Sequence, residues 1–193
     1  MPGLGALILV VGPSGAGKDT LLAGAMERLT GTGRFQLARR VITRPADAGS
    51  ENHIEMDEAA FRTAEANGEF LLSWRAHGLC YGIPRDPYAK LREDGVAVIA
   101  NVSRGVIGEA RARLQPVAVV SVAASPAVLA ARLAARGRED AADIEARLAR
   151  ADALDVGGHD VSTVMNDGAL DVGVAAMAAA LEGASTAEWN PAE

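Results

Sequence analysis

The chain has 193 residues, of which 49% are hydrophobic and 23% are charged, and these values fit one globular domain with a sizeable core. Its formal net charge of −6 argues against general nucleic-acid binding and against attachment to a membrane surface. A single cysteine, Cys80, excludes an internal disulfide and a cysteine metal cluster. The apolar N-terminal run is too short to span a membrane and has no basic leader, so we expect a cytoplasmic protein.

Apolar runs and helical periodicities alternate along the chain. Strands are predicted at residues 6–11, 36–42, 70–73, 96–100, 117–122 and 161–165. Helices are predicted at residues 18–29, 58–67, 87–92, 105–114, 126–136, 141–153 and 170–181. This alternation predicts an α/β fold with a mostly parallel central sheet and helices on both faces. We expect residues 1–182 to form a single domain and residues 183–193 to form a frayed tail.

Residues 7–22 carry the strongest functional signal. The apolar strand Leu7–Val11 leads into a turn with the pattern Gly-x-x-x-x-Gly-Lys, and a helical pattern follows. This order is typical of a phosphate-binding loop, in which backbone N–H groups and a helix N-terminus hold phosphate oxygens. Lys18 is expected to contact the β- and γ-phosphates of a nucleoside triphosphate. The predicted nucleotide-binding residues here are Gly12, Pro13, Ser14, Gly15, Ala16, Gly17, Lys18, Asp19 and Thr20.

The residue after the lysine is unusual for such a loop. A serine or threonine that binds Mg²⁺ is common at this position, and here it is Asp19, followed by Thr20. Since Mg²⁺ is held by one or two carboxylates, waters and substrate phosphates, Asp19 is a candidate direct or water-mediated magnesium ligand. Thr20 is the weaker candidate. The alternative is that Asp19 only stabilises the first turn of the helix through its charge.

Residues 33–92 differ from the rest of the chain in composition, and we interpret them as an inserted lobe that covers an acceptor substrate. Arg44 follows a strand-like segment and precedes Pro45, which is a good place to hold an anion. The segment from His77 to Pro84 predicts a tight turn into a short strand, and His77 and Tyr81 can both donate hydrogen bonds. The alternative for the arginines of this lobe is that they pair with acidic residues at the surface, which we expect for Arg62. The basic residues of the lobe include Arg39, Arg40, Arg44, Arg62, Arg75, His77 and Arg85.

Residues 126–150 are rich in alanine and arginine and read as two helical arms joined at Gly137. Such arms are typical of a lid that closes over a nucleotide and excludes water. Arg132, Arg136 and Arg147 are candidates to stabilise a phosphoryl group during transfer. The alternative is a surface helix laced with arginine–acid pairs.

Together these features resemble the guanylate-kinase-like branch of the nucleoside monophosphate kinases over about residues 7–171. The matching motifs are the loop 12–18, Thr43-Arg44, residues 68–71, the segment 77–82, the lid residues Arg132, Arg136 and Arg147, and residues 164–167. The resemblance implies a P-loop kinase fold, ATP and Mg²⁺ as cofactors, phosphoryl transfer onto a phosphate, and a place for Asn166 near the adenine. Two positions depart from it: Leu72 replaces the glutamate that reads guanine, and Asn101 replaces an aspartate.

A closer resemblance is to the ribose 1,5-bisphosphate phosphokinase family. It is carried by Gly17-Lys18-Asp19, by residues 74–84 and by Asn101-x-Ser103-Arg104. It implies ATP-dependent phosphorylation of the 1-phosphate of ribose 1,5-bisphosphate, giving 5-phospho-α-D-ribose 1-diphosphate, within bacterial phosphonate utilisation. Lys18, Arg136 and Arg147 would then be catalytic. The predicted residues for binding the phosphorylated sugar are Arg44, Arg75, His77, Tyr81, Asn101, Ser103 and Arg104.

Two other functions stay open at this point. One is a nucleotide kinase with an altered base preference, and the other is a non-catalytic guanylate-kinase-like interaction module. We expect small-molecule partners and neither nucleic acid nor membrane.

Overall fold

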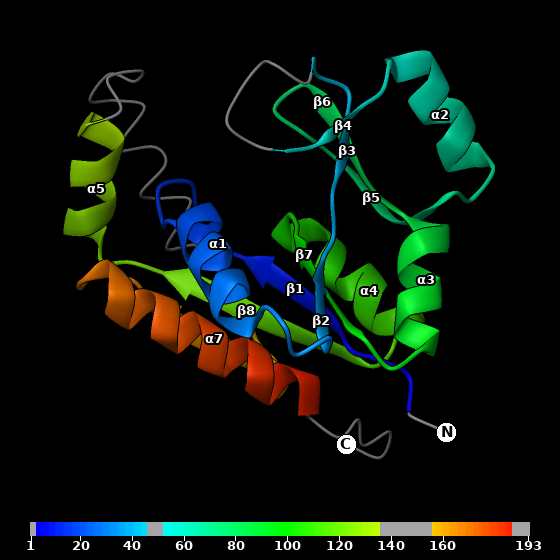
Figure 1. The fold of residues 1–193 in the computed structure, drawn as a ribbon. Coiled ribbons are helices and arrows are strands. Elements are labelled where there is room, and N and C mark those ends of the chain that lie inside the picture. Colours follow the sequence, from blue (N-terminus) through cyan, green and yellow to red (C-terminus); the bar gives the residue numbers. More distant parts are fainter. Residues whose placement is uncertain (1–2, 46–51, 136–155, 187–193) are drawn as a thin grey trace. The chain divides into compact units, whose positions relative to one another are not determined.

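The computed structural model describes residues 3–45, 52–135 and 156–186, which fall into two compact units (Figure 1). Of the described residues, the loop unit comprises 10–31, 119–135 and 156–186, and the hairpin unit comprises 3–9, 32–45 and 52–118. Among the described residues, one sheet has the strand order β2-β7-β1-β8-β9 and a second has the order β4-β3-β6-β5. The predicted α/β class with a mostly parallel central sheet is confirmed.

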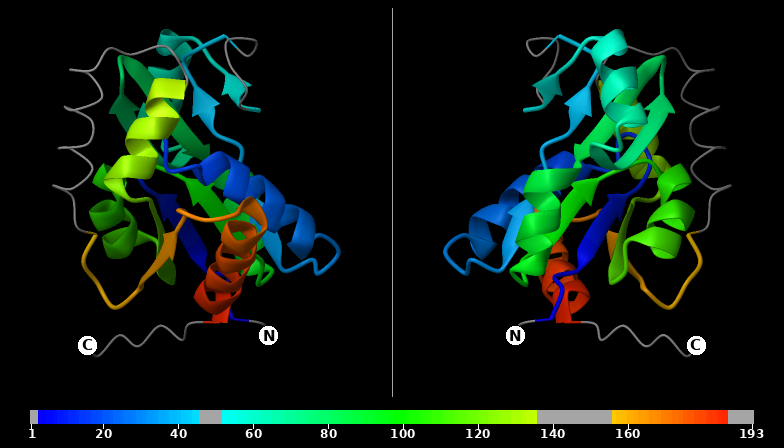
Figure 2. Two further views of the ribbon diagram at one scale, coloured as in Figure 1. Left: turned by 90° about the vertical axis from the view of Figure 1, so that its left-hand side faces the viewer. Right: turned by 90° about the vertical axis from the view of Figure 1, so that its right-hand side faces the viewer.

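The loop unit contains a pair of parallel strands and a pair of packed helices. Its elements are the end of β1 (Leu7–Val11), α1 (Lys18–Leu29), most of β8 (Val117–Ala123), α5 (Pro126–Ala135), β9 (Val161–Met165) and α7 (Leu170–Thr186). β8 and β9 run parallel, with Val119 opposite Val161. α1 and α7 lie side by side in Figures 1 and 2. Gly24 permits this approach, because a Cβ there would collide with the side chain of Val174.

The hairpin unit holds the second sheet and the helices next to it. Its elements are β2 (Phe35–Leu37), β3 (Val41–Ile42), β4 (Ile54–Glu55), α2 (Glu58–Ala66), β5 (Phe70–Ala76), β6 (Leu79–Pro84), α3 (Arg85–Glu93), β7 (Ala97–Asn101), the 3₁₀-helix η1 (Arg104–Val106) and α4 (Ile107–Arg113). β5 and β6 form an antiparallel hairpin in which Ala76 lies opposite Leu79. His77 and Gly78 make the two-residue turn with φ of 52° and 74°. Positive φ at both positions matches the twist of the strands, so the predicted tight turn is confirmed.

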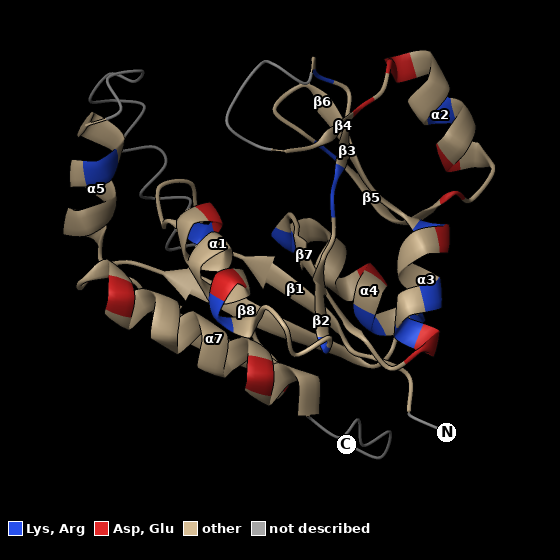
Figure 3. Ribbon diagram, viewed as in Figure 1, with Lys and Arg blue, Asp and Glu red and all other residues tan. Residues whose placement is uncertain are grey.

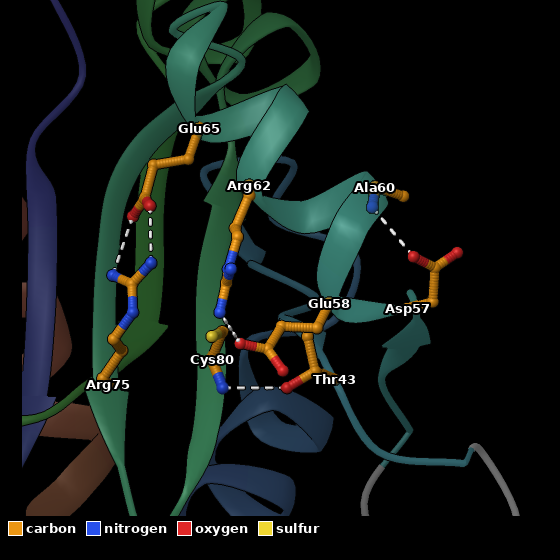
Figure 4. Close-up of polar contacts among 8 residues, drawn as sticks. All are labelled: Thr43, Asp57, Glu58, Ala60, Arg62, Glu65, Arg75 and Cys80. Carbon is orange, nitrogen blue, oxygen red and sulfur yellow. Dashed lines mark hydrogen bonds and ion pairs between the residues drawn. The ribbon is translucent and has the colours of Figure 1, made fainter.

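Helix α2 covers one face of the second sheet. Asp57 begins the helix, because its carboxylate accepts a hydrogen bond from the Ala60 amide at 2.8 Å (Figure 4). The rings of Phe61 and Phe70 stack with their centroids 4.7 Å apart. The core between helix and sheet consists of Val41, Phe61, Ala64, Phe70 and Cys80.

A buried arginine joins three segments of the hairpin unit. Arg92 is 4% exposed, and its guanidinium donates to the carbonyls of Gly5 at 2.8 Å, Leu114 at 2.7 Å and Pro116 at 3.1 Å. Burial lowers the pKa of Arg92.

The charged residues on the surface of the hairpin unit are of both signs. Figure 3 shows basic and acidic residues intermixed on α2 and α3. One exposed pair is Lys90 and Asp94, whose charged groups lie 2.8 Å apart.

Several predicted boundaries need correction. The strand expected at 36–42 is two strands in different sheets, because the Ala38 amide still pairs with Ile99 whereas the Arg40 carbonyl pairs with Ile54. The helix expected at 105–114 begins with η1, which Ser103 caps by accepting a bond from the Gly105 amide. Helix α7 continues to Thr186, beyond the end of the helix predicted at 170–181, since Ala184 is still buried. The helix predicted at 141–153 lies outside the described residues. Within the described part of the chain, no helix is both long and apolar enough to cross a membrane.

Candidate functional site

The loop between β1 and α1 has the conformation of a phosphate cradle. All five residues of β1 are buried, and the chain then turns through Gly12 with φ of 149° and Gly17 with φ of 86°. A Cβ at Gly12 would collide with the carbonyl oxygen of Val122 on β8, so only glycine fits there. Gly17 immediately precedes α1, and no side chain caps the first turn of that helix. The N-terminus of α1 therefore meets the loop, in the arrangement that binds phosphate in other proteins.

Two side chains from distant parts of the loop unit hold this loop. The amide of Asn166, which is 5% exposed, donates from Nδ2 to the carbonyl of Ala16 at 2.7 Å. Arg132 of α5 reaches the same carbonyl with Nη1 at 3.4 Å. The backbone of Asn166 is fixed in turn, because its N–H donates to the Ala123 carbonyl at 2.8 Å. Asn166 thus positions the phosphate loop, a role that the sequence analysis does not assign to it.

The charged groups of the loop fit a nucleotide with its magnesium ion. Lys18 Nζ donates to the carbonyls of Gly12 at 2.8 Å and Pro13 at 3.1 Å, so the ammonium lies over the cradle. Asp19 and Thr20 are exposed in the first turn of α1. A carboxylate and a hydroxyl beside a phosphate cradle are hard oxygen donors, the kind of ligand that Mg²⁺ takes along with substrate phosphates. Among the described residues, no group of three or more His, Cys, Asp or Glu side chains gathers into a protein-only metal site.

The predicted acceptor residue Arg44 lies where β3 leaves the sheet. The Thr43 hydroxyl, rather than its carbonyl, accepts the Cys80 amide at 2.9 Å, and the Thr43 amide donates to the Cys80 carbonyl at 3.1 Å (Figure 4). The half-buried Arg44 follows. Its carbonyl accepts a hydrogen bond of 2.9 Å from Nε2 of His53, which is 2% exposed. His53 therefore fixes the backbone at Arg44, although the sequence contains no local pattern that indicates this.

Three aromatic and basic side chains form a layer in the hairpin unit. Trp74 and Tyr81 lie opposite each other on β5 and β6, and their rings stack at 5.4 Å with an interplanar angle of 6°. The Arg40 guanidinium carbon lies 5.5 Å from the centroid of the Tyr81 ring. Arg40 Nη1 also donates to the carbonyl of Asn101 at 3.2 Å. The structure thus brings together Tyr81 and Asn101, both predicted, with Arg40, which the sequence presents only as one basic residue among several.

Other predicted acceptor residues lie elsewhere in the hairpin unit. Arg75 binds Glu65 of α2 through two hydrogen bonds of 2.7 and 3.2 Å, and this pairing lowers the pKa of Glu65 and raises that of Arg75 (Figure 4). His77 is exposed at the hairpin turn, while Ser103 caps η1. Arg104 is half-buried in η1, which packs against β5, and burial lowers its pKa. The predicted surface pairing of Arg62 is confirmed by its bond to Glu58.

The predicted lid is described only in part. Helix α5 presents Leu129 and Leu133 to Gly15 of the phosphate loop. Arg136 and Arg147 lie outside the described residues.

Comparison with known proteins identifies the family. A family model described as an AAA domain matches residues 8–151. A protein named ribose 1,5-bisphosphate phosphokinase PhnN from a Ruegeria species is 48% identical over 174 residues, covering 90% of each chain. Its namesake from Methylobacterium radiotolerans is 48% identical over 178 residues, covering 92% of this chain and 97% of the relative. The chain belongs to the ribose 1,5-bisphosphate phosphokinase family.

Two other matches set the limits of the likeness. A bifunctional ribose 1,5-bisphosphokinase-thymidine phosphorylase from Cupriavidus pinatubonensis is 48% identical over 188 residues, but the chain spans only 31% of its length. A guanylate kinase from Anaplasma phagocytophilum superposes with a TM-score of 0.68 at 16% identity, covering 96% of this chain and 89% of that one. At this identity the likeness shows the fold alone, and the predicted P-loop kinase fold is confirmed.

Proposed function

We propose that the protein transfers the γ-phosphoryl group of ATP to the 1-phosphate of ribose 1,5-bisphosphate, giving ADP and 5-phospho-α-D-ribose 1-diphosphate. The observation that carries this proposal is the 48% identity to relatives named for this activity, along 90–97% of their length. Following the family resemblance, we further propose a role in phosphonate utilisation and a cytoplasmic location.

The loop unit supplies the groups for ATP. In the proposed mechanism the backbone N–H groups of residues 14–17 and the N-terminus of α1 bind the β- and γ-phosphates. Lys18 exchanges its contacts to the loop carbonyls for phosphate oxygens, an exchange favoured because those oxygens are anionic. Asp19, with Thr20 beside it, would hold Mg²⁺, which when bound neutralises charge on the phosphates.

The chemistry needs no strong base. An oxygen of the sugar's 1-phosphate is already anionic, and it forms a bond to the γ-phosphorus as the bond to the β–γ bridging oxygen breaks and ADP leaves. The work of the protein is then to position the two substrates and to neutralise charge. We assign Arg44 to the acceptor, and Arg136 and Arg147 to the phosphoryl group in transfer.

Leu72 argues against the guanylate kinase alternative. Its side chain is 1% exposed within β5 and cannot accept hydrogen bonds from a guanine edge. A guanine base buried there with unpaired hydrogen-bond donors would bind more weakly, by roughly 1–3 kcal/mol of binding free energy for each unpaired group. The intact phosphate loop, with Lys18 over it, argues against a module that has lost catalysis.

The test is ³¹P NMR of the protein with Mg-ATP and either ribose 1,5-bisphosphate or GMP. The proposal predicts new diphosphate resonances from the sugar together with ADP, and no turnover of GMP. The matched control is Lys18→Met, which should abolish turnover while leaving the fold intact, because Lys18 lies at the loop and is not part of the buried core. Turnover of GMP alone would refute the sugar assignment.

A further inference from the structure

The layer formed by Arg40, Tyr81 and Trp74 has a defined place in the hairpin unit. Neighbouring residues on a strand point to opposite faces of a sheet. Cys80 packs in the core under α2, and Arg75, which lies opposite Cys80, binds Glu65 of that helix (Figure 4). Trp74 and Tyr81 therefore point to the other face, away from α2.

Arg40 is held in a fixed orientation on that face. The guanidinium carbon lies over the Tyr81 ring, 5.5 Å from its centroid, and Nη1 donates to the Asn101 carbonyl at 3.2 Å. A planar guanidinium ordered in this way is suited to bidentate binding of a phosphate, because little side-chain entropy remains to be lost.

The surroundings of Arg40 also favour an anionic ligand. Asn101 is the last residue of β7, and ligands of open α/β sheets bind beyond the carboxyl ends of strands. Arg104 follows three residues later in η1, which packs against β5. In a chain with a net charge of −6, two half-buried arginines at this end of β7 are a local basic feature.

We propose that Arg40 binds one of the two phosphates of the acceptor, and that it thereby makes the site selective for a bisphosphorylated sugar over a monophosphorylated one. Arg44 is assigned to the other phosphate. Residues 40 and 44 lie on either side of the two-residue strand β3, with a bend at residues 43 and 44, and in this proposal the two guanidinium groups serve different parts of the ligand. The inference rests on the proposed function and adds a specificity-determining residue to it.

The test compares the binding of three sugar phosphates and ATP to wild type and to one variant. Calorimetry measures the dissociation constants of ribose 1,5-bisphosphate, ribose 1-phosphate, ribose 5-phosphate and ATP for wild type and Arg40→Met. We expect binding of the bisphosphate and of one monophosphate isomer to weaken about 10- to 100-fold, as for a lost charge-assisted pair. The other isomer and ATP should bind as before. The matched control is Arg62→Met, which removes an exposed arginine on α2 that binds Glu58.

Each outcome separates the inference from its alternatives. Equal weakening for all three sugars would assign Arg40 a merely structural role and overturn the inference, as would unchanged affinities. Arg40→Lys, which keeps the charge but not the planar fork, should show the same isomer selectivity with a smaller loss, and it replaces the methionine variant if that variant does not fold. If wild type neither binds nor phosphorylates ribose 1,5-bisphosphate, the proposed function itself fails.

Discussion

Replacing Asn166 by alanine should loosen the phosphate loop, because it removes the side-chain hydrogen bond that holds Ala16. The Asn166 amide is the short donor to the Ala16 carbonyl, at 2.7 Å, and Ala16 is fully buried. Asn166→Ala removes that donor and leaves a buried carbonyl with only the longer bond from Arg132, at 3.4 Å.

The magnitude follows from the burial of that carbonyl. A buried polar group that loses its partner costs about 1–3 kcal/mol. Because Arg132 still reaches the oxygen, we expect the free energy of unfolding to fall by about 1–2 kcal/mol, or roughly 3–6 °C in Tm for a chain of this size. Asn166→Asp should cost more, about 3 kcal/mol, because a buried carboxylate would face the carbonyl as a second acceptor.

Urea denaturation and ATP calorimetry measure the two consequences. ATP affinity should fall roughly 3- to 10-fold in Asn166→Ala, because part of the binding energy is then spent on ordering the loop. Thr163→Ala on β9 is the matched control, since Thr163 is exposed and lies on the strand that precedes Asn166. If Asn166→Ala matched this control in both stability and ATP affinity, the loop would not depend on the bond to Ala16.

Three further predictions test other parts of the structure. Gly17→Ala should weaken ATP binding at least tenfold and lower Tm, because φ is 86° and a Cβ would lie 2.5 Å from Asn166 Nδ2; a variant that binds ATP normally in calorimetry would contradict this. Arg92→Met should lower the free energy of unfolding by roughly 3–5 kcal/mol, since three carbonyls lose a buried charged donor; urea unfolding measures it, and Lys90→Met on the same helix should change little. Hydrogen bonds from Arg75 and Ser73 lower the pKa of Glu65 in the folded state. The ionised Glu65 carboxylate therefore stabilises the fold above its unfolded pKa, and this contribution is lost as the pH falls through its folded pKa. When the pH is lowered from about 6 to about 2–3, the free energy of unfolding measured by urea titration should therefore fall less in Glu65→Gln than in wild type. Equal falls in the two proteins would refute the pairing.

The elements with strong local patterns were predictable from sequence. Helix α1 has the predicted bounds Lys18–Leu29, and β9 has the predicted bounds Val161–Met165. In both segments one signal dominates, a glycine-rich turn before an apolar helical face or a short β-branched run bounded by turn residues. The family resemblance was confirmed because it rests on such contiguous motifs.

The strand predicted at 36–42 shows where local patterns fail. Its residues are apolar enough for one strand, but the choice between two sheets depends on partners far away, Ile99 for Ala38 and Ile54 for Arg40. Hydrogen-bond partners of this kind are set by the packing of whole elements, and propensity does not encode them.

Sequence alone therefore determined the chemistry of the phosphate loop, since Gly12 to Lys18 are adjacent and their conformation is local. Only the tertiary structure decided what holds that loop and what forms the acceptor side. Asn166 reaches the Ala16 carbonyl across 150 residues, and Arg40 reaches Asn101 across 61. A side chain's partner at such a distance is fixed only when the sheets and helices have packed, because no spacing in the chain specifies which buried carbonyl an amide or a guanidinium will meet.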